Sequence, residues 1–148
     1  MDDKTPIGLN IAIIDRAFRK KLDEKASRMG LTSSQIRALA AISLMETSGV
    51  AEINQRMLEE HEQVTHPTMT GILQRLENKG FIKSEPSAVD RRYKKINSTG
   101  QGVGISKKLE DQDMEILKEL CSGMTEEQIN QFLELTQMMV NTIARIDN

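Results

Sequence analysis

The stretch VTHPTMTGILQRLENKGFIKSEPSAVDRRYKKIN, residues 64–97, decides how the chain folds. Its first part has apolar residues spaced at i, i+3, i+4 and i+7, which places them on one side of a helix: Met69, Ile72, Leu73 and Leu76. The opposite side is polar, short-chained and free of acids, with Pro67, Thr70, Gly71, Gln74 and Asn78. Gly80 stands where a helix end favours a left-handed residue, so the helix is predicted to stop there.

The second part of the stretch predicts a two-stranded hairpin with a charged tip. Phe81 and Ile82 begin a strand, Pro86 ends it, and residues 92–97 can return as its partner. The connecting loop ends in Asp-Arg-Arg, residues 90–92. A helix with a small polar outer face and a basic hairpin are suited to a groove of double-stranded DNA and its phosphate backbone.

The residues before this stretch predict three further helices. Apolar residues recur every three or four positions from Pro6 to Met29, and Gly30 ends that pattern. Residues 32–35 form a capping box that opens a second helix, which ends by Ser48-Gly49. A third helix is expected from Ala51 to about Glu60, with residues 61–64 as the turn and Thr65 or His66 as the next cap. Two short helices, a turn and a hairpin make a winged helix-turn-helix.

Two more helices are expected after the hairpin. Thr99 caps the first, although its glycine-rich start, residues 100–104, predicts fraying. A second capping box at residues 125–128 opens the last. The first and last helices are not needed to complete the winged domain, so a second copy of the chain is the simplest partner for their apolar faces. The expected dimer contacts are Ile7, Ile11, Ile14, Phe132, Met139, Val140 and Ile143.

The predicted fold is therefore mainly α with a small β-wing. It is a winged helix-turn-helix with N- and C-terminal dimerisation helices. We expect three parts: residues 1–30 as an N-terminal dimerisation helix, residues 31–98 as the DNA-binding domain, and residues 99–148 as the C-terminal helices that complete the dimerisation region.

Composition and charge agree with a cytoplasmic, non-enzymatic DNA-binding protein. The 148 residues carry a formal net charge of −2, yet residues 65–96 hold seven bases and three acids, a local net charge of +4. No apolar run approaches the roughly 20 residues needed to span a bilayer. The single cysteine, Cys121, excludes an intrachain disulfide, and a buried thiol is favoured over a redox sensor. No cofactor is predicted, because no residues with catalytic or metal-ligand spacing come together.

With these features the chain resembles the MarR family of transcription regulators. The helix-turn-helix reads INQRMLEEHEQVTHPTMTGILQRLENKGFI and matches the family pattern, in which a Thr-x-Thr pair opens the recognition helix and Leu-Glu-x-x-Gly closes it. These are Thr68, Thr70, Leu76, Glu77 and Gly80. The wing pattern, Asp-x-Arg, five residues, then Leu-Thr, appears here as Asp90, Arg92, Ser98 and Thr99, with serine in place of the usual leucine.

The resemblance implies a homodimer that represses transcription from a palindromic operator until a small-molecule effector of unknown identity, or an oxidant, releases it. Any effector pocket would lie between the dimerisation helices and the winged domain. The implied wing contact is Arg92, oriented by Asp90. The expected recognition-helix contacts with DNA are Thr65, His66, Pro67, Thr68, Thr70, Gly71, Gln74 and Arg75. The expected wing contacts are Lys83, Asp90, Arg91, Arg92, Lys94 and Lys95.

Several alternatives stay open. The Gln74 face is also compatible with ordinary solvated surface, and Asp90 to Arg92 with a surface turn. Lys94 and Lys95 also suit protection of an edge strand. His61 and His66 lack the companions of a metal site. The main alternative function is a winged-helix module that binds protein partners without specific DNA binding.

Overall fold

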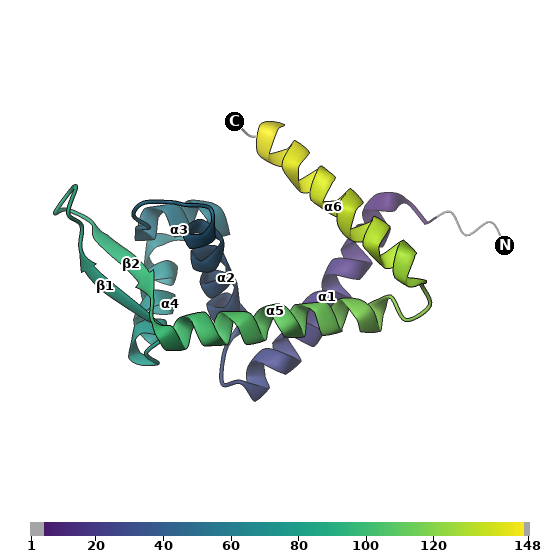
Figure 1. The fold of residues 1–148 in the computed structure, drawn as a ribbon, viewed down its shortest axis with the longest axis horizontal. Coiled ribbons are helices and arrows are strands. Elements are labelled where there is room, and N and C mark those ends of the chain that lie inside the picture. Colours follow the sequence, from purple (N-terminus) through teal and green to yellow (C-terminus); the bar gives the residue numbers. More distant parts are fainter. Residues whose placement is uncertain (1–4, 147–148) are drawn as a thin grey trace.

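The computed structural model describes residues 5–146. Among them it has six helices and one antiparallel hairpin, as the sequence predicts. Figure 1 shows the winged domain at one end and the outer helices at the other, joined by one long helix. The elements in chain order are α1 (Ile7–Arg28), α2 (Ser33–Thr47), α3 (Gln55–Glu62), α4 (His66–Asn78), β1 (Ile82–Pro86), β2 (Lys94–Ser98), α5 (Gly100–Leu120) and α6 (Glu126–Ile146).

The predicted capping boxes are confirmed by their hydrogen bonds. At α2, the Gln35 amide donates to Thr32 Oγ1 at 3.2 Å, and the Thr32 amide donates to Gln35 Oε1 at 3.3 Å. The same exchange joins Thr125 and Gln128 before α6. Each pair satisfies backbone donors that a helix start would otherwise leave unpaired, and so fixes where the helix begins.

The prediction for the third helix was wrong at both ends. The helix does not begin at Ala51, because Ile53 forms an isolated antiparallel β-bridge with Ile96 of β2. Asn54 then caps α3, accepting a hydrogen bond from the Met57 amide at 3.1 Å. The helix continues to Glu62 and closes on Gln63, whose φ of 54° lies in the left-handed region. The turn of the helix-turn-helix is therefore shorter than the expected residues 61–64.

The glycine-rich start of α5 is helical from Gly100 rather than frayed. Thr99 Oγ1 accepts a hydrogen bond from the Gly102 amide at 3.0 Å and donates to the Gly80 carbonyl at 2.5 Å. Gly102 is buried, and a Cβ placed on it would lie 1.9 Å from the Phe81 carbonyl oxygen. The glycine thus allows close packing of α5 on the Phe81 backbone between α4 and β1, which outweighs its low helix propensity.

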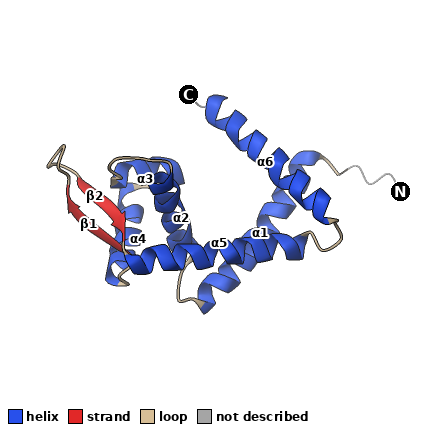
Figure 2. Cartoon of the chain, in the orientation of Figure 1, coloured by secondary structure: helices blue, strands red, loops and turns tan. Residues whose placement is uncertain are grey.

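The hydrophobic core lies inside the winged domain and extends into the flanking helices. Buried side chains from α2, α3, α4 and the hairpin form one cluster with Ala26 of α1 and Leu109 of α5. The hairpin pairs in an antiparallel register from Ile82 opposite Ser98 to Pro86 opposite Lys94. In Figure 2 this red ribbon lies beside α4 and its loop projects away from the helices. Its base is held by the core, and its loop extends beyond the helices.

The outer helices are far less buried. Helix α6 has no buried residue, and α1 has only Ala26. Figure 1 shows α6, in yellow, rising from the end of α5 that is far from the winged domain. Ionic and hydrogen-bonding contacts fix α1 on α5: Lys25 Nζ donates to Gln112 at 2.8 Å and Glu115 at 3.1 Å. Within residues 5–146, none of the helices is both long enough and apolar enough to cross a bilayer.

Candidate nucleic-acid interface

Helix α4 has one buried and one exposed side, as its sequence pattern predicts. Met69, Ile72, Leu73 and Leu76 are buried in the core. The predicted contact residues Thr65, His66, Pro67, Thr68, Thr70, Gln74 and Arg75 are all exposed, and Gly71 is partly buried. Among the described residues, the Gln74 side chain makes no hydrogen bond, so its amide is free to donate and accept. This leaves a polar helix face that no other element of the described chain covers.

The N-terminal end of that face is held in place by Gln55 of α3. Gln55 Nε2 lies 2.8 Å from Thr70 Oγ1 and 3.3 Å from the His66 carbonyl oxygen. The Thr70 hydroxyl donates to the same His66 carbonyl at 2.9 Å. His66 Nδ1 lies 2.6 Å from Glu59 Oε1. Because the Thr70 proton is already used inside the protein, its oxygen can offer only an acceptor to an outside partner.

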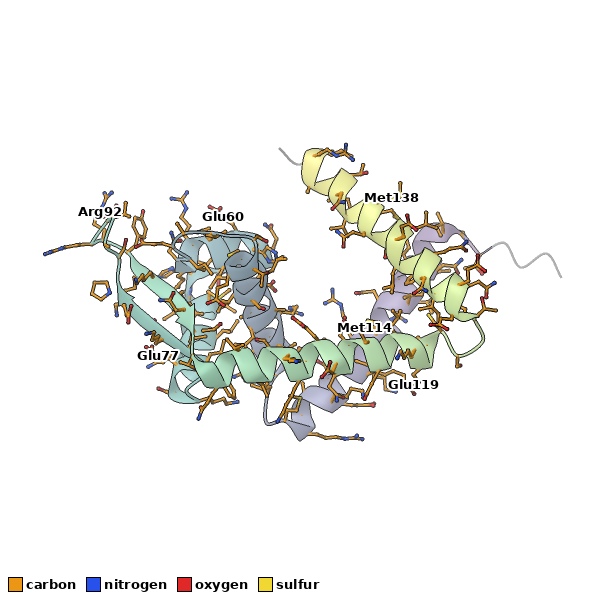
Figure 3. All side chains as sticks on the ribbon, viewed as in Figure 1. Glu60, Glu77, Arg92, Met114, Glu119 and Met138 are labelled. Atoms are coloured by element: carbon orange, nitrogen blue, oxygen red, sulfur yellow. The ribbon has the colours of Figure 1, made fainter. Side chains whose placement is uncertain are left out.

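The wing tip presents Arg92 in a fixed orientation. Its Nε and one terminal nitrogen donate to the two oxygens of Asp90, at 3.0 Å and 2.7 Å. This fork holds the pKa of Asp90 below its usual range. The Arg92 side chain remains 83% exposed, and Figure 3 shows it at the far end of the hairpin. The guanidinium keeps its other N–H groups free for an acceptor.

The loop behind Arg92 is tied to the body of the protein by Glu52 and Ser87. The buried Ser87 hydroxyl donates to Glu52 Oε2, and the Ala88 amide donates to Glu52 Oε1 at 3.3 Å. Ser87 Oγ also accepts from the amides of Val89 and Asp90, each at 3.1 Å. One serine and one carboxylate thus order the segment that places Asp90 and Arg92.

The basic residues predicted from the sequence fall into two groups. Lys83 and Lys95 both pair with Glu85, at 3.1 Å and 3.6 Å, which lowers the pKa of that carboxyl. Arg91 and Lys94 on the wing and Arg75 on α4 are exposed and form no ion pair within residues 5–146. The second group therefore has its full charge available to an outside anion.

Lys79, which contributes to the positive charge of residues 65–96, lies elsewhere. Its Nζ donates to the Gly30 carbonyl and, at 3.1 Å, to Gln35 Oε1. It joins the end of α4 to the turn between α1 and α2. This lysine has a structural role, which charge counting along the sequence could not distinguish.

A groove of about 800 Å³ separates α3, α4 and the wing. Its lining includes the sequence-predicted residues His66, Thr70, Gln74, Arg92 and Lys94. It also includes residues that sequence reasoning missed: Asn54, Gln55, Arg56 and Tyr93. The Asn-Gln sequence before α3 is an N-cap signal, and locating the helix start there would have placed Gln55 and Arg56 on its first turn.

The predicted dimer contacts are solvent-exposed in the single chain. Ile7 is 74% exposed, and Ile143 is 54% exposed. Ile11, Ile14, Met139 and Val140 are also exposed, and Phe132 is partly buried. Further apolar side chains that the sequence analysis did not single out accompany them, including Leu9, Ile13, Leu135 and Met138.

Comparisons with known proteins agree with this geometry. Residues 29–92 match the model of the MarR family. The chain is 28% identical over 129 residues to the HTH-type transcriptional regulator PapX of Escherichia coli, covering 86% of this chain and 76% of PapX. A crystal structure of MarR superposes with a TM-score of 0.83 at 24% identity, covering 99% of this chain and 96% of that one.

A structure of the S. aureus MepR–DNA complex also matches. It has a TM-score of 0.69 at 23% identity, with coverage of 94% of this chain and 99% of MepR. The family match lies on the winged domain and the structural matches include the outer helices. Over residues 29–92 the chain is similar to the MarR family, and as a whole it has the fold of the solved MarR and MepR structures.

Proposed function

We propose that this protein is a homodimeric, sequence-specific DNA-binding transcriptional regulator that represses from a palindromic operator. The observation that carries the proposal is the uncovered surface formed by the polar face of α4 and the Arg92 tip of the wing. A recognition helix reads base edges in the major groove, and a wing contacts the adjacent backbone or minor groove. The MepR match, solved with DNA, supports this assignment.

Each surface residue has a role that its chemistry allows. Gln74 carries a free amide, and such a side chain pairs with adenine through two hydrogen bonds. Thr70 offers an acceptor. Arg92 enters the minor groove beside the wing, held by Asp90. Arg75, Arg91 and Lys94 contact phosphates, which position the protein without specifying sequence.

A second copy of the chain completes the assembly. Two recognition helices related by a two-fold axis should meet successive major grooves about 34 Å apart. The exposed apolar residues of α1 and α6 provide the interface, because apolar area of this extent is unfavourable in water. Residues 1–30 and 99–148 thereby serve dimerisation, and residues 31–98 serve DNA binding.

Regulation by a small molecule is part of the proposal. A cavity of about 450 Å³ lies where α1, α2 and α5 meet, between the outer helices and the winged domain. A ligand there would contact both parts, so it could favour one relative placement of them over another. The alternative function, protein binding through the wing, does not require a ligand in this cavity.

The experiment is selection of genomic DNA fragments on the full-length protein, followed by affinity measurements on a retained sequence at several salt concentrations. The Arg92→Ala variant should bind about tenfold more weakly, and its salt dependence should fall by about one unit of slope. Lys118→Ala removes an exposed base from α5, away from the proposed surface, and should leave both quantities unchanged.

Two outcomes would contradict the proposal. Recovery of no sequence above background would favour the protein-interaction alternative. Equal losses for Arg92→Ala and Lys118→Ala would mean that the effect is one of overall charge rather than of contact by the wing.

A further inference from the structure

The cavity between α1, α2 and α5 has apolar walls and an uneven set of polar groups. Leu22, Ile36, Ala40, Leu44 and Leu109 provide the apolar lining. The charged lining residues are Arg37, Glu110 and Asp113. A volume of about 450 Å³ falls in the range of small-molecule pockets. The question is which ligand charge these groups would accept.

The one cation in the lining is already neutralised. Arg37 Nε lies 3.2 Å from Glu62 Oε2, and the Glu62 side chain is only 13% exposed. Freeing Arg37 for an anionic ligand would take its one guanidinium partner from that largely buried carboxylate, leaving it only His61, whose Nδ1 lies 3.0 Å from Glu62 Oε1, and this loss is costly. An anion in the cavity would therefore gain little from Arg37.

The two acids in the lining have no such partner. Within residues 5–146, Glu110 and Asp113 form no ion pair. Desolvation raises the pKa of Asp113, as expected for a carboxyl near apolar walls without a nearby cation. The two residues are one helical turn apart on α5, so both can face the same ligand.

Ser106 provides an independent observation that points to a ligand. The Ser106 residue is only 7% exposed, and it lines the cavity one helical turn before Glu110. Its hydroxyl is the one buried side-chain polar atom in the described residues that has no hydrogen-bond partner. Buried polar groups are normally paired, so an orphan hydroxyl at a cavity wall marks a place for a polar group of a bound molecule.

We propose that this cavity binds an amphiphilic organic cation, with its apolar body against the leucines and its ammonium group held by Glu110, Asp113 and Ser106. The N–H groups donate to the carboxylates and to Ser106 Oγ, which supplies the missing partner. This inference rests on the proposed function in one respect: a bound cation should change the affinity for DNA only if the protein binds DNA. The binding itself is a property of the free protein.

The test uses three naphthalene probes of matched size with a positive, a neutral or a negative group: 2-(1-naphthyl)ethylamine, 2-(1-naphthyl)ethanol and 1-naphthylacetate. Binding to the full-length protein without DNA is followed by probe fluorescence, which the absence of tryptophan leaves unobstructed. The amine should bind most tightly and the acetate most weakly.

Variants then assign the site. Glu110→Gln with Asp113→Asn should weaken the amine about tenfold or more and leave the alcohol unchanged, because only charge is removed. Ser106→Ala should weaken the amine and the alcohol alike. Asp111→Asn, a neighbouring exposed acid outside this cavity, is the matched control and should change nothing. Thermal unfolding of each variant shows that it is folded.

Tighter binding of the acetate than of the amine would overturn the proposal, as would retention of amine affinity by the double variant within a factor of two. The amine is then added to the DNA complex. If it binds the cavity but leaves DNA affinity unchanged, the ligand-responsive part of the proposed function fails and this inference stands. If DNA binds and the amine does not, only this inference fails.

Discussion

The winged domain and the outer helices of this chain use similar apolar residues with opposite results. In the winged domain, Leu39, Ile42, Leu58 and Leu76 have no exposed surface. In α6, Leu135, Met139 and Ile143 remain more than half exposed. Fully burying one such side chain contributes about 1.5–3 kcal/mol, so the second group leaves a large favourable term unused in a single chain. The first region is complete as a fold, whereas the second exposes an apolar surface that the proposed dimer would bury.

The largest effect is expected from a charge placed on the exposed apolar face of α6. Ile143→Asp should weaken self-association by at least about 100-fold, since the two-fold axis of the proposed dimer would place the carboxylate in the interface twice. Analytical ultracentrifugation over a concentration series measures this. Gln137→Asp adds the same charge at an exposed polar position of α6 and is the control.

If Ile143→Asp associates as the unchanged protein does, this face of α6 is not in the interface. Unfolding of the winged domain should be little affected in either variant, because Ile143 makes no part of its core.

The winged domain should instead lose stability when a side chain is added at Gly102. Gly102→Ala places a methyl group 1.9 Å from the Phe81 carbonyl oxygen and should lower the free energy of unfolding by about 3 kcal/mol. Urea unfolding followed by circular dichroism measures this. Gly104→Ala is the matched control in the same helix: its Cβ meets nothing within 4 Å, so it should stabilise by up to about 1 kcal/mol.

Opposite signs for the two alanines would support close packing of α5 on the Phe81 backbone. The same sign for both would mean that helix propensity, rather than contact with Phe81, governs this segment.

The smallest of the three effects concerns the wing tip, which belongs to the winged domain but lies outside its core. Glu52→Ala removes the acceptor for Ser87 and Ala88 and should weaken DNA binding about fivefold; it should also lower the free energy of unfolding by about 1 kcal/mol, because the buried Ser87 hydroxyl loses its acceptor. Fluorescence anisotropy with labelled operator measures it. Glu52→Gln keeps one acceptor oxygen and should recover part of the loss.

The sign of this effect is informative. Loss of a carboxylate near DNA would strengthen binding if only charge mattered. A gain in affinity for Glu52→Ala would therefore contradict a positioning role for Glu52.

The sequence alone determined the elements whose signals are local. The apolar spacing of α4, the capping boxes at Thr32 and Thr125, and the stop at Gly80, whose φ is +77°, depend on residues within one or two turns of each other. The Asp90–Arg92 pair was assigned by resemblance. The two residues are only two positions apart in the sequence, so the local backbone brings them together.

Only the tertiary structure decided the contacts between distant segments. Lys79 reaches Gly30 and Gln35, Glu52 holds Ser87, and Gln55 holds Thr70, although nothing in their local patterns joins them. The expected helix at Ala51 gave way to the Ile53–Ile96 bridge, and one glycine of α5, Gly102, proved to be a packing requirement. Local periodicity specifies which face of an element is apolar, whereas which polar groups meet depends on how the packed elements place them.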